Sequence, residues 1–148
     1  MQQTVCIISG STLGSAEYLA EHCEDVLQQH GIKTALLHGA NWDQINDFQY
    51  WLIVTSTHGA GDLPDNLSPL FEHIEQEIDD LSQVRFAVIG LGNSDYDTFC
   101  FSVNKIEAVL NQKQAIKLAD SLKIDVLNCF DHDQAADNWL PQFIDQLK

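Results

Sequence analysis

Apolar runs of strand length alternate with amphipathic helical stripes along the whole of this 148-residue chain. The runs are rich in Val, Ile and Leu, and they predict strands at 4–9, 33–38, 50–55, 85–90 and within 115–127. Between the runs, apolar residues recur three or four positions apart, which is the spacing of one buried helix face. Strands that alternate with helices indicate parallel βαβ units with right-handed crossovers.

We therefore expect one α/β domain over residues 1–148, with a five-stranded parallel sheet between two helical layers. This is a three-layer, doubly wound sandwich. A chain of this length can bury a sizeable core, and its hydrophobic content of 45% is typical of a globular protein. The run 50–55 is the most continuously apolar, which favours a central strand covered on both faces.

The formal net charge of −15 limits the partners that the chain can have. Such a charge repels nucleic acid and anionic membranes and attracts basic proteins. No apolar run approaches the roughly 20 residues that span a bilayer, and the first residues lack a basic segment ahead of an apolar one. We expect a cytoplasmic monomer. Its four cysteines show no metal-ligand spacing, so we interpret them as small hydrophobic residues and expect no metal.

The turn at 9–17 is the first candidate site, because it joins the first strand to the first helix. Gly10 and Gly14 allow a tight turn, and Ser11, Thr12 and Ser15 supply hydroxyl groups. Uncapped N–H groups at the start of a helix bind anions. The turn has neither the Gly-Lys-Ser/Thr of a Walker A loop nor G-x-G-x-x-G. It is compatible with a phosphate cradle without a cation, and also with an ordinary strand-to-helix turn.

Two further glycine-containing turns follow the third and fourth strands, at 56–66 and 90–99. The carboxyl ends of parallel strands meet at one edge of the sheet, where ligands bind in open α/β folds. His58 and Tyr96 stand in polar surroundings outside any helical stripe, and both can stack on a ring. Each is also compatible with an ordinary loop residue. Three such turns predict one planar, phosphorylated ligand held by all of them.

The three turns together resemble those of the flavodoxins, over the whole length of the chain. The resemblance rests on Gly-Ser-Thr-Leu-Gly-Ser-Ala-Glu at 10–17, Ser-Thr-His-Gly-Ala-Gly-Asp at 56–62 and Gly-Leu-Gly-Asn-Ser-Asp-Tyr at 90–96. It implies the flavodoxin-like strand order 2-1-3-4-5 and noncovalently bound FMN. The implied phosphate contacts are Ser11, Thr12, Leu13 (through its N–H), Gly14, Ser15 and Ala16. The implied ring contacts are Thr57, His58, Gly59, Ala60, Gly61, Gly92, Asn93, Tyr96 and Phe99.

The resemblance also implies a function without substrate chemistry of its own. A flavodoxin passes single electrons from an NADPH-dependent flavodoxin reductase to an iron–sulfur or other metalloenzyme acceptor, for which biotin synthase is one possibility. We expect basic partners to dock on an acidic face formed by Asp62, Asp65, Asp95, Asp97 and the carboxylates of 72–80. The alternative is an NAD(P)H-dependent flavin or quinone reductase on the same fold. A phosphoacceptor domain would need carboxylates where Ser9 and Gly10 stand.

Overall fold

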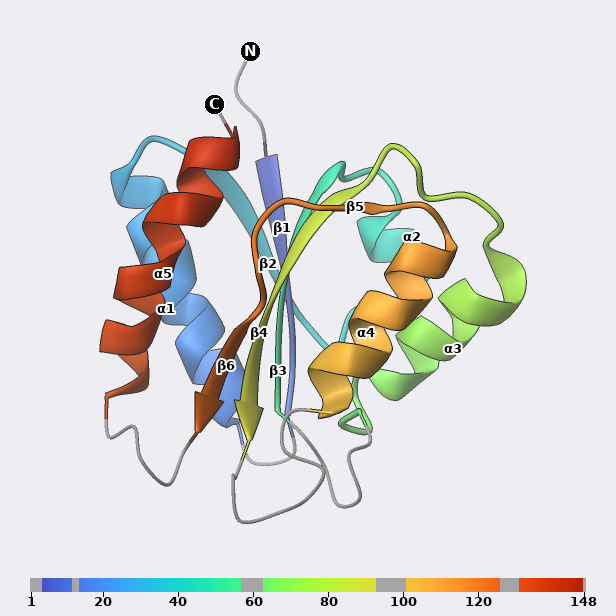
Figure 1. Cartoon of the computed structure of the whole chain (residues 1–148), viewed down its shortest axis with the longest axis horizontal. Coiled ribbons are helices and arrows are strands. Elements are labelled where there is room, and N and C mark those ends of the chain that lie inside the picture. The colour runs from blue at the N-terminus through green and yellow to red at the C-terminus, as the bar shows by residue number, and fades with distance from the viewer. Residues whose placement is uncertain (1–3, 12–13, 57–62, 93–100, 126–130, 148) are drawn as a thin grey trace.

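The computed structural model describes residues 4–11, 14–56, 63–92, 101–125 and 131–147 (Figure 1). Strands and helices alternate in it, as the sequence pattern predicts. Their order is β1 (Thr4–Gly10), α1 (Ser15–Gln29), β2 (Lys33–His38), α2 (Trp42–Ile45), β3 (Tyr50–Ser56), α3 (Ser68–Glu77), β4 (Arg85–Gly92), α4 (Phe101–Gln112), β5 (Ile116–Lys117), β6 (Leu122–Asp125) and α5 (His132–Leu147).

All strand pairs of the sheet are parallel, and the order β2-β1-β3-β4-β5 confirms the predicted fold class. One row of the register runs from Leu36 through Ile7 and Leu52 to Ala87. The first strand of the chain therefore lies inside the sheet, between β2 and β3. This arrangement reverses the direction in which the chain winds on either side of β1, which is the condition for a binding crevice at the carboxyl edge.

Two short strands fill the fifth position, where the sequence predicts one strand with unclear limits. β5 pairs with the start of β4, and β6 pairs with its end. Between them, the Asp120 carbonyl accepts a hydrogen bond from Trp139 Nε1 of α5 at 2.7 Å, and the Ser121 hydroxyl donates to Glu107 of α4. Side chains of both helical layers thus bind this segment where its strand pairing with β4 is interrupted.

The sheet separates two hydrophobic layers, with α1 and α5 on one face and α2, α3 and α4 on the other (Figure 1). Successive strand residues point to opposite faces. Ile7 and Leu52 pack toward α1 and α5, whereas Ile8 and Ile53 pack toward α2, α3 and α4. The helical stripes seen in the sequence supply the other half of each layer.

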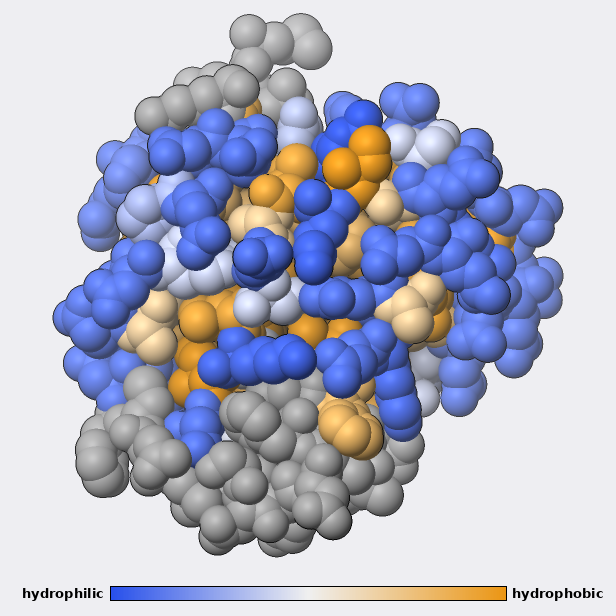
Figure 2. All heavy atoms as spheres, viewed as in Figure 1, coloured by the Kyte–Doolittle hydropathy of each residue, from blue (hydrophilic) through white to orange (hydrophobic). Residues whose placement is uncertain are grey.

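The outer surfaces of the helices are mainly hydrophilic. Figure 2 shows this for α5 on one side and for α3 and α4 on the other, with hydrophobic residues visible mainly over β5 and β6. Within the described part of the chain, no helix is both long enough and apolar enough to cross a membrane.

Cys6 on β1 and Cys23 on α1 are free, fully buried thiols, as the sequence suggests. The pKa of each is raised from 9.0 to about 12, by burial at Cys6 and by burial together with the nearby Asp133 and Asp137 of α5 at Cys23. Both thiols therefore stay protonated at neutral pH, and a protonated thiol is a weak nucleophile.

These raised pKa values predict a loss of stability in alkali. Above pH 9 the unfolded chain releases thiol protons that the folded chain keeps, so unfolding becomes easier as the pH rises toward 12. Each thiol contributes a slope of about 1.4 kcal/mol per pH unit in that window. Urea unfolding at several pH values above 8 measures the slope. A Cys6→Val, Cys23→Ala variant should show a shallower slope, and an equal slope would contradict the prediction.

Candidate functional site

The carboxyl ends of β1, β3, β4 and β6 lie at the same edge of the sheet, the lower edge in Figure 1. Gly10 is in register with Thr55, Ser56 with Leu91, and Gly92 with Asp125. The chain therefore leaves three neighbouring strands at this edge, at Gly10, Ser56 and Gly92. These are the points at which the sequence predicts the three binding turns.

The N-terminus of α1 lies at this edge and is open to an anion. Gly14 is the N-cap residue, with φ of 88°, and no side chain among the described residues caps the helix. Its carbonyl accepts the first helical hydrogen bond, from Tyr18 N at 3.0 Å. The N–H groups of Ser15 and Ala16 precede that bond. They point along the axis with the positive end of the helix dipole, which suits a phosphate group.

Ser11 connects the end of β1 to this helix. Its hydroxyl oxygen accepts a hydrogen bond from Gly14 N at 2.8 Å, and the hydroxyl donates to Glu17 Oε2. The second oxygen of Glu17, Oε1, accepts a hydrogen bond from Asn66 Nδ2 at 3.3 Å. Sequence reasoning included both residues in its candidate turns, 9–17 and 56–66, but gave neither a role. The sequence brings the two turns to one edge of the sheet, whereas the contact between Glu17 and Asn66 is seen only in the structure.

The space beside Gly10 at this junction is too small for a side chain. A Cβ atom at Gly10 would lie 2.3 Å from Leu67 Cγ and 2.7 Å from Asn66 Oδ1. Contacts below 3.0 Å force the neighbours to move, and Leu67 is fully buried. The close approach of Leu67 thus fixes how the first turn leaves the sheet.

The structure brings together Ser11, Gly14, Ser15 and Ala16 at the start of α1, and it places Gly92 at the end of β4, two strands away from β1. The remaining predicted contacts lie outside the described residues: Thr12, Leu13, Thr57, His58, Gly59, Ala60, Gly61, Asn93, Tyr96 and Phe99. The described part of the site is therefore mainly the part predicted to contact the phosphate, which we call its phosphate side.

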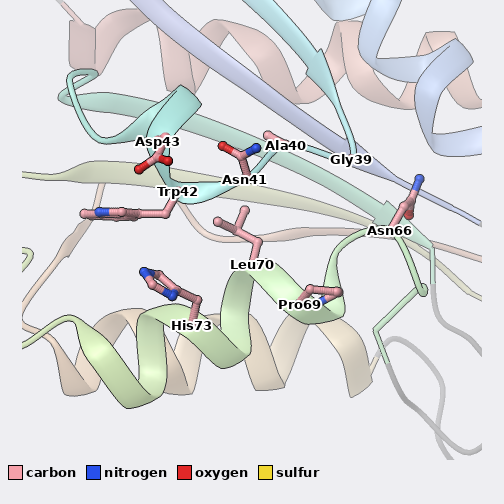
Figure 3. A pocket seen from close by; sticks show the side chains of 9 residues that line it. All are labelled: Gly39, Ala40, Asn41, Trp42, Asp43, Asn66, Pro69, Leu70 and His73. Atoms are coloured by element: carbon pink, nitrogen blue, oxygen red, sulfur yellow. The ribbon is translucent and has the colours of Figure 1, made fainter.

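A cleft of about 460 Å³ lies beside the first turn, between the turn after β2 and the first turns of α3 (Figure 3). Trp42 and His73 face each other at one end, with ring centroids 6.3 Å apart, and Asn66 lies at the other end. Sequence analysis did not predict this cleft. It lies where another parallel strand ends, so the same edge argument could have indicated it.

The family model for flavodoxin matches residues 7–139. The chain is 57% identical over 144 residues to the MioC homolog of Haemophilus influenzae, covering 97% of this chain and 99% of that protein. A solved mutant flavodoxin from Pseudomonas aeruginosa superposes with a TM-score of 0.91 at 32% identity, covering 98% of this chain and 99% of that one.

The solved flavodoxin of Fusobacterium nucleatum bound to flavin mononucleotide shares the fold. Its TM-score is 0.85 at 16% identity, and the match covers 99% of this chain and 100% of that one. The resemblance of the sequence to the small flavodoxins of the MioC type is confirmed by these matches. With the sheet order, the three strand ends and the open start of α1, they show that this chain belongs to the flavodoxin family.

Proposed function

We propose that the chain binds FMN at the carboxyl edge of its sheet and carries single electrons between proteins. The observation that carries this proposal is the uncapped start of α1 beside the ends of β3 and β4, in a chain of the flavodoxin family. The geometry offers an anion site next to three strand ends. The other predicted contact residues follow these strand ends in the sequence. A phosphate on a planar ligand fits this arrangement.

The described residues suit the phosphate group of FMN without help from a cation. Residues 9–17 contain no Lys or Arg, so the attraction from this turn would come from hydroxyl groups, from backbone N–H groups such as those of Ser15 and Ala16, and from the helix dipole. The space beside Gly14 is open in the described part of the chain, where no atom lies within 4 Å of a Cβ added at this residue. FMN supplies the one-electron chemistry when bound, and the protein supplies binding, orientation and electrostatics.

Titration with FMN tests the proposal directly. We expect flavin fluorescence to be quenched on addition of the protein, with a dissociation constant of about 1 µM or lower, a free energy of binding of about −8 kcal/mol. Replacing Gly14 with aspartate should weaken FMN binding at least about tenfold, because it adds a carboxylate at the anion site and a side chain at a φ of 88°. Gly14→Asn, with similar backbone strain and no charge, should weaken it less. Absence of binding at micromolar FMN would overturn the proposal. Direct oxidation of NADPH by the isolated holoprotein would instead support the reductase alternative.

We further propose that an acidic surface formed by α3 and the residues flanking it docks basic partners, namely a flavodoxin reductase and a metalloenzyme acceptor. The carboxylates of Asp65, Glu72, Glu75, Glu77, Asp79 and Asp80 belong to exposed residues. α3 begins near the binding edge, so the first of these charges lie close to the proposed flavin site. Such a surface steers an oppositely charged partner and favours rapid association.

Salt should therefore slow the reduction of the holoprotein by a reductase. Raising the ionic strength from about 0.01 M to about 0.15 M shortens the Debye length from roughly 30 Å to roughly 8 Å, and we expect the second-order rate to fall about tenfold. Stopped-flow reduction measures this rate. Glu72→Lys should lower it at low salt, whereas Asp25→Lys, on the opposite helical layer, should change it much less. Equal effects of the two variants would contradict docking on α3.

A further inference from the structure

Glu17 holds two hydrogen-bond donors of the phosphate side at once. Its Oε2 accepts from the Ser11 hydroxyl, and its Oε1 accepts from Asn66 Nδ2 at 3.3 Å. The carboxylate thus ties the first turn to the segment that precedes α3. Glu17 is half-buried, and Ser11 is only 9% exposed.

The Ser11 hydroxyl can donate one hydrogen bond, and it donates that bond to Glu17. Its oxygen already accepts the Gly14 N–H, so a phosphate oxygen can gain a hydrogen bond from Ser11 only if the hydroxyl leaves Glu17. A phosphate at the start of α1 would also lie near a carboxylate of the same sign. Like charges at close range oppose each other most strongly where water is partly excluded.

We propose that the Glu17 carboxylate selectively weakens the binding of phosphorylated flavin. It holds Ser11 and Asn66 in place before the ligand arrives, and then competes with the phosphate for the hydrogen bond that the Ser11 hydroxyl donates. Glu17 therefore reduces the preference of the protein for FMN over riboflavin, which has the same ring system without the phosphate. This inference rests on the proposed FMN function.

The replacement Glu17→Gln tests the charge while keeping the length of the side chain. Isothermal titration of the apoprotein with FMN and with riboflavin gives the two dissociation constants. We expect FMN to bind about tenfold more tightly to this variant, and riboflavin binding to change by less than about twofold. Glu21→Gln, one turn further along α1 at an exposed residue, makes the same change in net charge. It should alter neither constant by more than about twofold.

A second variant tests whether Glu17 acts through the Ser11 hydroxyl. Ser11→Ala removes the hydrogen-bond donor for which carboxylate and phosphate compete. In a protein that carries Ser11→Ala, Glu17→Gln should therefore tighten FMN binding clearly less than it does in the protein that keeps Ser11. Thermal unfolding of each apoprotein checks that the variants are folded.

Unchanged or weaker FMN binding to folded Glu17→Gln would overturn the inference and leave the proposed function standing. An equal gain for riboflavin would also overturn it, because the effect would then not depend on the phosphate. Failure of the unsubstituted protein to bind either flavin would overturn the proposed function and this inference together.

Discussion

Replacing Trp51 with alanine is expected to lower the free energy of unfolding by about 3–5 kcal/mol. Trp51 lies on β3, between Cys6 of β1 and Phe86 of β4, and is fully buried. Its indole packs edge-on against Trp42, and its Nε1 donates to the Phe48 carbonyl at 2.9 Å. Removal of the ring leaves a cavity in the central strand and deprives that carbonyl of its donor.

Urea unfolding at neutral pH measures the effect, which should shift the midpoint without changing the slope. The free energy of unfolding of such domains is about 5–15 kcal/mol, so the expected loss is a large part of it. Trp42→Ala is the matched control, because Trp42 is only half-buried and its removal should cost clearly less. Trp51→Phe should recover most of the packing but not the hydrogen bond. A loss below about 1 kcal/mol for Trp51→Ala would contradict the structure of this layer.

Replacing Gly10 with alanine is expected to impair both stability and flavin binding. The new Cβ would lie 2.3 Å from Leu67 Cγ, and overpacking of this kind costs about 1–3 kcal/mol. Either Leu67 or the end of β1 must move, and movement of β1 displaces Ser11 relative to the start of α1. We expect FMN to bind at least about tenfold more weakly, since small displacements of positioning groups have effects of this size.

The control for Gly10→Ala is Gly31→Ala, at the far end of α1. Gly31 has φ of 77°, and no atom of the described residues lies within 4 Å of an added Cβ. This variant should lose about 1–2 kcal/mol through backbone strain and keep its FMN affinity. Combining Gly10→Ala with Leu67→Ala should cost less than the sum of the two, because the second change removes the clash. Strict additivity, or unimpaired FMN binding by Gly10→Ala, would contradict the contact seen here.

Periodicity was enough to predict most of the fold. The runs that include Ile7, Leu52 and Ala87 became neighbouring parallel strands. The stripe of α1, with Leu19, Cys23 and Leu27, became its buried face. These features depend on the spacing of apolar residues along one segment, and each segment shows that spacing by itself.

The split of the fifth strand was not predictable in the same way. The residues 115–127 contain apolar positions for a strand, but Trp139 and Glu107 come from helices elsewhere in the chain. They bind the polar groups of Asp120 and Ser121, which an unbroken strand would direct otherwise. Because the end of the strand depends on side chains of two other elements, it cannot be predicted from the sequence of the strand alone.

The sequence by itself determined that strands and helices alternate, and that serine and glycine residues stand where β1 passes into α1. Parallel strands then require the binding turns to share one edge of the sheet. Only the tertiary structure decided that Asn66 meets Glu17, 49 positions away, and that Leu67 fills the space beside Gly10. Local patterns determine whether a segment forms a strand or a helix and which face it buries, whereas such contacts depend on how closely separate segments pack. Packing is settled jointly by all side chains of a layer, and no single stretch of the sequence shows it.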